Sequence, residues 1–228
     1  MWIDDIVLQR CREAFAVHTW VPERSCVVLG SSNDAERECN LATCHAENIE
    51  ILRRAGGGGT VVLHTGCVIV TIGTWVQHYY KNGNYFSLLN ASLISALATS
   101  WPALGKMAQA GISDIVINNR KVAGTSLFRS RNYLLFQASI LVEDQIATVE
   151  KYLAHPSKEP DYREGRSHSA FLSCLGEFVP RLSAQEVHAQ LNEIRWTDHL
   201  SNLGTELIPP VVEQIPHILT KASKDPAQ

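Results

Sequence analysis

The stretch Arg53-Arg54-Ala55-Gly56-Gly57-Gly58-Gly59-Thr60 places four consecutive glycines between two apolar runs, 48–52 and 60–63. Backbone without Cβ atoms lets a ligand or another chain segment approach the peptide N–H groups closely. The two preceding arginines can clamp an anion with their guanidinium forks. The glycine spacing matches neither a Walker loop nor a dinucleotide fingerprint. The stretch predicts a loop that binds phosphate or carboxylate, although a flexible hairpin or a close backbone crossing explains it equally well.

Apolar patterning on both sides of this loop predicts an α+β fold. Short β-branched runs predict strands at 25–30, 48–52, 60–63, 68–72, 115–117, 122–128 and 133–142. Helical spacing, with a capping box at Ser183, predicts helices at 5–15, 36–46, 86–97 and 183–194. Thr65-Gly66 suggests a hairpin between two of the strands, and Asn118-Asn119 marks another tight turn. Strands joined in hairpins favour a largely antiparallel mixed sheet flanked by helices.

The composition excludes several classes of protein. The chain has 20 basic and 23 acidic residues among 228, so no general basic surface for nucleic acid or a membrane is expected. Hydrophobic residues make up 45%, enough to bury a sizeable core. With no repeat or low-complexity linker, we expect one domain over residues 1–228. Pro209, Pro210 and Pro216 predict a loosely packed tail over about 200–228.

Six cysteines occur without a Cys-x-x-Cys pair and without a secretory signal. Reduced thiols and a cytoplasmic location are the simpler expectation. Cys39, Cys44 and His45 have metal-binding chemistry, but their spacing matches no closed zinc pattern. We expect no metal site built from protein ligands alone.

A second candidate site runs from Ser113 to Ser126 and contains Lys121 between a turn and a strand. A solvated hairpin lysine is the common fate of such a residue. The small residues that follow it, Ala123-Gly124-Thr125-Ser126, argue instead for something packed close by, such as a ligand.

Four ordered segments resemble the lipoate–protein ligase A family, within the biotin/lipoate ligase and octanoyltransferase superfamily. The glycine stretch, read on to Val61, looks like the family's signature loop. Residues 27–40 resemble the segment upstream of that loop. Asp114-Ile115 followed by 121–126 resembles the segment of the catalytic lysine, and 133–142 resembles the strand after it. The resemblance covers roughly residues 20–175 in the family's order.

The resemblance implies that lipoate is condensed with ATP to lipoyl-adenylate, and that the lipoyl group then passes to a lysine of a lipoyl-domain protein. Lys121 would be catalytic, stabilising charge that develops during the attack. Mg²⁺ would arrive with ATP, and Asp114 could hold Mg²⁺ or adenosine. The implied substrate and nucleotide contacts are Arg53, Arg54, Gly56, Gly57, Gly58, Gly59, Thr60, His64, Asp114, Gly124, Thr125, Ser126 and Gln137.

The segment 155–168 is dense in Pro, Arg and His. We interpret it as a lid that orders over the nucleotide, with Arg163 or Arg166 touching phosphate. A solvated loop is the plainer alternative.

The chain departs from the family pattern at three positions in its sequence and in its length. Leu63-His64 stands where the family usually has a His-Asp pair, and Cys67 stands where an Asn is common. Gln137-Ala138 replaces the usual His-Gly of the later strand. The C-terminal accessory domain of full-length ligases has no counterpart after the catalytic segments. Either a separate subunit supplies that part, or the enzyme is a transferase that forms no adenylate.

The transferase alternative is an ATP-independent octanoyl or lipoyl transferase that works through a cysteine thioester. Its candidate nucleophiles are Cys67, beside the glycine loop, and Cys174, whose pKa could be lowered by Arg163, Arg166 and His168. Free cysteines are usually buried, which argues against both. A non-enzymatic acyl-binding subunit is a third hypothesis, and the presence of Lys121 disfavours it.

Overall fold

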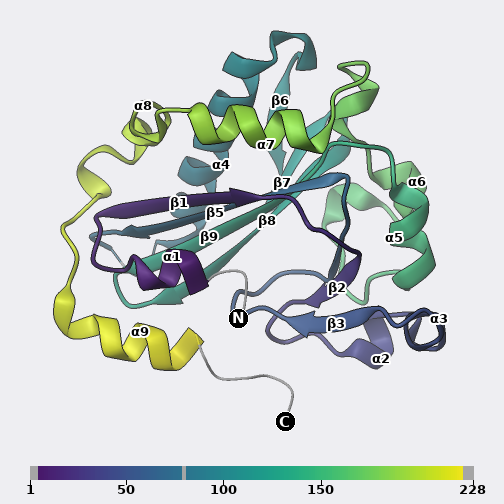
Figure 1. Ribbon diagram of the computed structural model, residues 1–228, viewed down its shortest axis with the longest axis horizontal. Helices are drawn as coiled ribbons and strands as arrows, with labels where there is room; N and C mark the ends of the chain where they lie inside the picture. The colour runs from purple at the N-terminus through teal and green to yellow at the C-terminus, as the bar shows by residue number, and fades with distance from the viewer. Residues whose placement is uncertain (1–4, 79–80, 223–228) are drawn as a thin grey trace.

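A computed structural model describes residues 5–78 and 81–222, which form two β-sheets with flanking helices (Figure 1). The larger sheet is antiparallel throughout, in the order β1 (Phe15–Trp20), β5 (Cys67–Trp75), β9 (Tyr133–Leu141), β8 (Arg120–Ser130), β7 (Asp114–Ile117) and β6 (Met107–Ala110). The smaller sheet pairs β2 (Cys26–Leu29) parallel with β3 (Glu50–Arg53) and antiparallel with β4 (Val61–Leu63). The predicted α+β fold with largely antiparallel pairing is confirmed.

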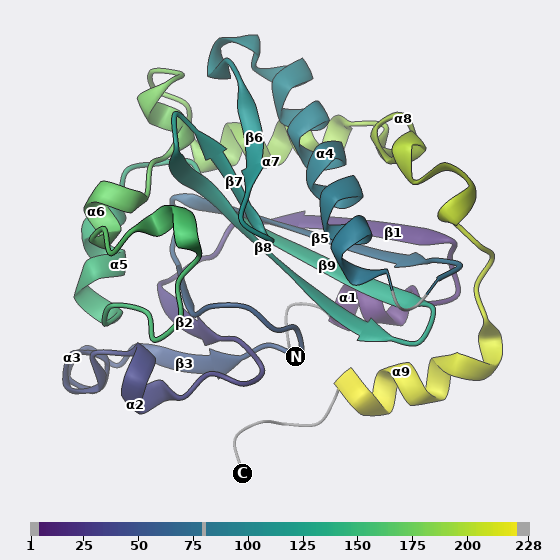
Figure 2. The same ribbon diagram turned by 180° about the vertical axis from the view of Figure 1, so that it is seen from behind.

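Both faces of the large sheet are covered. Successive β5 side chains point to opposite faces, so Val70 and Ile72 enter one core and Ile69 enters another. Helices α4 (Asn82–Ser100) and α7 (Ala184–Glu193) cover the first face, which carries Val70 and Ile72. Both helices lie above the sheet in Figure 1, and Figure 2 shows the molecule from the opposite side. The predicted capping box at Ser183 and Glu186 begins α7. The small sheet and α5 (Ile146–Tyr152) pack against the second face.

The two ends of the described chain lie together on the second face. Val7 of α1 (Asp5–Gln9) and Ile218 of α9 (Ile215–Ala222) are fully buried in one cluster with Trp75. Residues 200–222 therefore differ from the loosely packed tail that their prolines predicted, because the apolar face of α9 covers the sheet. The last six residues of that predicted tail lie outside the described residues. No helix within the described ranges is long and apolar enough to span a membrane.

Three local predictions are wrong. The expected hairpin at Thr65-Gly66 does not form, because β4 joins the small sheet and β5 joins the large one. The helix expected over 5–15 ends at Gln9, and the chain then continues into β1. This strand was not predicted, because it forms by pairing with β5, which is distant in the sequence. The helix expected over 36–46 divides into α2 (Ala35–Glu38) and α3 (Leu41–Ala46). It breaks where the Asn40 side chain turns to donate to backbone carbonyls at the end of α5.

Candidate active site

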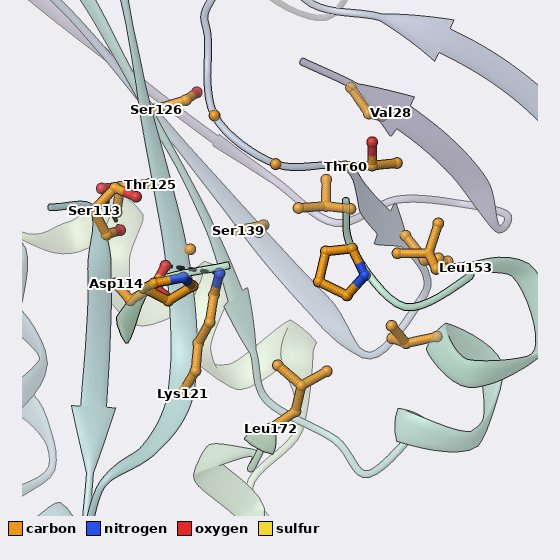
Figure 3. Close-up of a pocket in the computed structure, with 18 of the residues that line it drawn as sticks. Val28, Thr60, Ser113, Asp114, Lys121, Thr125, Ser126, Ser139, Leu153 and Leu172 are labelled. Atoms are coloured by element: carbon orange, nitrogen blue, oxygen red, sulfur yellow. Dashed lines mark hydrogen bonds and ion pairs between the residues drawn. The ribbon is translucent and has the colours of Figure 1, made fainter. Parts of the chain in front are cut away.

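A cavity of about 770 Å³ lies between the small sheet and the second face of the large sheet (Figure 3). A row of cross-strand neighbours forms part of its lining: Asp114, Gly124, Ser139, Ile69 and Trp20, on β7, β8, β9, β5 and β1 in turn. Cross-strand neighbours project from the same face of a sheet. The row therefore leads from a polar end at Asp114 to an apolar end at Trp20.

A β-bulge turns Lys121 toward this cavity. Asp114 pairs with Gly124, but two residues later Val116 pairs with Lys121, so β8 contains one extra residue at this point. In a regular strand, residues 121 and 124 would point to opposite faces. The extra residue brings Lys121 to the face of Asp114. The turn before it is the predicted tight one, with positive φ at Asn118 and Asn119.

Lys121 and Asp114 form an ion pair of 2.7 Å between Nζ and Oδ1, with 21% and 9% of the two side chains exposed (Figure 3). The other oxygen of the carboxylate, Oδ2, accepts a 2.8 Å hydrogen bond from the Tyr162 hydroxyl. Gly124 gives the lysine its space, because a Cβ there would lie 2.8 Å from Nζ. A side chain at position 124 would therefore push the end of the Lys121 side chain away from its place in this pair.

Arg54 holds the glycine loop together from inside. Its side chain is buried, and Nη2 donates to the carbonyls of Gly57 and Gly59 at 2.8 and 2.7 Å. Arg53 points elsewhere, and its Nη1 donates to the carbonyls of Gly30 and Asn33. Both arginines therefore shape the backbone of the site, and Arg54 alone of the two lines the cavity. The sequence had predicted that both would clamp a ligand anion.

The four loop glycines have different reasons to be glycine. Gly58 has φ +95°, which favours glycine. Its carbonyl oxygen would also lie only 2.1 Å from a Cβ on Gly30, so the two glycines allow a close approach of their backbones. A Cβ on Gly56 would lie 3.2 Å from the backbone of β8. Gly57 and Gly59 have φ outside the left-handed region, and no described atom lies within 4 Å of a Cβ on either. Gly58 and Gly59 line the cavity, whereas Gly56 and Gly57 do not.

Part of the 155–168 segment lines the cavity and packs against other elements, while many of its other side chains are exposed. Ser157 donates to the buried Glu38 carboxylate, and Arg166 donates to the carbonyls of Asn119 and Tyr162 at 3.1 and 2.7 Å. Arg163 is buried over the ring of Phe171, 4.6 Å from its centroid. Of the two predicted phosphate contacts, Arg163 lines the cavity and Arg166 does not.

His64 and Cys67 form a buried pair outside the cavity lining. The amide of Gly66 donates to Nδ1 of His64 at 3.2 Å, so in the neutral ring the hydrogen sits on Nε2, which faces the Cys67 Sγ at 3.2 Å. Burial lowers the pKa of His64 to about 4 and raises the pKa of Cys67 to about 12. The ring offers the thiol no lone pair, so it cannot act as its base. His64, predicted as a substrate contact, is only 1% exposed and lies outside the cavity lining.

Cys174 has no better environment for nucleophilic attack. It is 1% exposed, and burial raises the pKa of its thiol. Neither Cys67 nor Cys174 lines the cavity. Within the described residues, no group of three His, Cys, Asp or Glu side chains could hold a metal ion.

The structure brings most of the predicted site residues to one cavity. Those that line it are Arg54, Gly58, Gly59, Thr60, Asp114, Lys121, Gly124, Thr125, Ser126, Gln137 and Arg163. Those that do not are Arg53, Gly56, Gly57, His64, Cys67, Arg166 and Cys174. Sequence reasoning missed Trp20, Glu38, Ser139 and Tyr162. Ser139 could have been found from strand alternation with Gln137, but Tyr162 gave no signal beyond its place beside Arg163.

Three solved structures have a similar fold. A Thermoplasma acidophilum protein with bound lipoic acid has 18% sequence identity, and the match covers 86% of this chain and 77% of that one, with a TM-score of 0.68. A bipartite lipoate protein ligase from the same organism, studied with its E2 lipoyl domain, has 18% identity, covers 99% and 87%, and has a TM-score of 0.72. A lipoate-protein ligase A bound with ATP has 19% identity, covers 98% and 89%, and has a TM-score of 0.68.

The sequence itself matches a family model, described as the lipoyl protein ligase A/B catalytic domain, over residues 1–194. This match includes all the strands of both sheets and every residue that lines the cavity. The chain therefore belongs to the lipoyl protein ligase A/B catalytic domain family.

Proposed function

We propose that this chain is an ATP-dependent lipoate–protein ligase, which activates lipoate as lipoyl-adenylate and transfers the lipoyl group to a lysine of a lipoyl-domain acceptor. The main observation in its support is that the Lys121 ammonium lies at the polar end of a cavity whose other end is apolar. Family membership supports this proposal, as do lipoic acid and ATP in solved structures of similar fold.

Lys121 has a role in both steps of this reaction. In the first, the lipoate carboxylate attacks the α-phosphorus of ATP and pyrophosphate leaves. The ammonium lowers the repulsion between the two anions that must meet. In the second, the acceptor amine attacks the acyl carbonyl and AMP leaves. The ammonium then stabilises the negative charge that develops on the oxygens. Asp114 holds the ammonium in place until substrate oxygens arrive.

The remaining lining fits the two parts of a lipoyl-adenylate. Val28, Val61, Val149 and Leu153 supply an apolar wall suited to an alkyl chain. Thr60 lines the cavity, and its buried hydroxyl has no hydrogen-bond partner among the described residues, so it is available to a ligand. Mg²⁺ would enter bound to ATP. Asp114, which lines the cavity and is paired with Lys121, is a single carboxylate, and Mg²⁺ needs the phosphates of the nucleotide as further ligands.

We also propose two protein partners and a location for this chain. The acceptor is a lipoyl-domain protein, and a separate subunit takes the place of the accessory domain of longer ligases. The bipartite ligase of similar fold supports both. The abundance of free thiols supports action in the cytoplasm.

A lipoate-dependent ATP–pyrophosphate exchange assay tests the activation step. With the accessory subunit added, we expect exchange only when lipoate is present, whether or not the acceptor protein is there. Absence of exchange, together with an acyl group trapped on Cys67 or Cys174 by an acylated carrier protein, would replace this proposal with the thioester transferase.

Replacing Gly59 with alanine should weaken substrate binding without weakening the fold. No described atom lies within 4 Å of a Cβ on Gly59, which lines the cavity, so the added methyl group meets the ligand and not the protein. We expect the KM for lipoate or ATP to rise about tenfold, which corresponds to about 1.4 kcal/mol, with an unchanged Tm. Gly57→Ala is the matched control, because Gly57 has the same freedom but lies outside the lining. Equal kinetics in the two variants would show that the loop does not contact the substrate.

A further inference from the structure

Tyr162 reaches the partner of Lys121 from a segment that lies about forty residues further along the chain. Its hydroxyl donates to Oδ2 of Asp114 at 2.8 Å, while Oδ1 of the same carboxylate holds Nζ of Lys121 at 2.7 Å. Among the described residues, each oxygen of Asp114 thus has one partner. The carboxylate cannot rotate without breaking one of the two contacts.

Tyr162 is itself fixed to the hairpin that carries this pair. Its backbone carbonyl accepts from Nη2 of Arg166 at 2.7 Å, and Nη1 of the same guanidinium donates to the carbonyl of Asn119 at 3.1 Å. The Tyr162 ring packs against Phe171, with 5.2 Å between ring centroids. Burial and the charge of Asp114 raise the pKa of Tyr162, so the phenol keeps its hydrogen and remains a donor.

We propose that Tyr162 is a positioning residue for acyl activation and transfer, acting through Asp114 on Lys121. The inference rests on the proposed function. The hydroxyl fixes the orientation of the carboxylate, so that Oδ1 points at the ammonium. Asp114 therefore holds Lys121 in one orientation, and substrate oxygens can replace Asp114 as the partner of the ammonium when they bind. Without the hydroxyl, the carboxylate turns and the ammonium loses its fixed place.

The chain contains the same arrangement outside the cavity. Tyr152 donates to Oε2 of Glu47 at 2.8 Å, and Oε1 of Glu47 holds Nζ of Lys151 at 2.7 Å. None of these three residues lines the cavity. Tyr152→Phe therefore removes an equivalent bond without touching the site and serves as the control for Tyr162→Phe.

The first measurement is steady-state lipoyl transfer by the full chain together with its proposed accessory subunit and its acceptor. We expect Tyr162→Phe to lower kcat about tenfold or more, since a hydrogen bond to a charged group is lost, and to change the KM for lipoate and ATP less than about threefold. Tyr152→Phe should match the unmodified protein. A rise in KM with kcat unchanged would show that Tyr162 only orders the 155–168 segment, and would overturn the proposal.

The second measurement needs no substrate, so it separates this inference from the proposed function. Lys121 and Lys151 are acetylated with limiting acetic anhydride, and each rate is read by mass spectrometry of peptides. We expect Lys121 to react several-fold faster in Tyr162→Phe than in the unmodified protein, with Lys151 unchanged. An unchanged or slower Lys121 rate would overturn the positioning role. Absence of turnover in the unmodified protein would overturn the proposed function, while the acetylation rates would still decide the role of Tyr162.

Discussion

Replacing Lys121 with alanine should lower the rate of lipoyl transfer by about 10²–10³-fold, the usual effect of losing one stabilising group at a developing oxyanion. Lys121 is the cation paired with Asp114 at the polar end of the cavity. The variant also leaves the Asp114 carboxylate, 9% exposed, without its cation. A lower Tm is therefore expected as well, and rates should be measured well below it.

Lys151→Ala provides the matched control for Lys121→Ala. It removes an ion pair of the same 2.7 Å length, but from an exposed pair with Glu47 that is away from the cavity. Such a pair contributes little to stability, so activity and Tm should stay close to those of the unmodified protein. Full transfer by Lys121→Ala would refute the role given to this lysine under both the ligase and the thioester hypotheses.

Replacing Arg54 with methionine should both destabilise the protein and impair binding. The change keeps an apolar stem of similar length but removes the donors to the carbonyls of Gly57 and Gly59. A hydrogen bond that involves a charged group contributes about 1.5–3 kcal/mol to stability. We expect a lower free energy of unfolding in urea and a loss of kcat/KM of about tenfold or more, because the loop loses its shape.

Arg53→Met is the comparison for Arg54→Met. Arg53 donates to the carbonyls of residues 30 and 33 and is only half-buried. Water can therefore replace part of these hydrogen bonds when the guanidinium is removed. Arg53→Met should therefore lower the free energy of unfolding and kcat/KM clearly less than Arg54→Met does. Equal effects of the two substitutions would contradict the view that Arg54 alone holds the inner side of the loop.

Local sequence was sufficient to find the two chemical features of the site. Four glycines after two arginines, and a lysine followed by small residues, depend on residues close in the chain, and the structure brings Gly59, Thr60 and Lys121 to one cavity. The tight turn at Asn118 and Asn119 is equally local. These patterns reflect backbone conformation, which the nearest residues decide.

Long-range geometry could not be read in the same way. The bulge that turns Lys121 toward Asp114 exists only in the pairing of β8 with β7. The roles of Gly30 and Gly58 depend on two loops meeting, and that of Tyr162 depends on a segment folding back onto the hairpin. Cys67 looked available from its place beside the loop, but its burial follows from the crossing of the chain between two sheets.

The central claim is tested most directly by the intact mass of a lipoyl-domain acceptor after incubation with this chain, the proposed accessory subunit, lipoate and ATP. The account predicts that the acceptor gains one lipoyl group on one lysine, only when ATP is present, and that Lys121→Ala suppresses the gain. Modification without ATP, from an acylated carrier protein as donor, would contradict it.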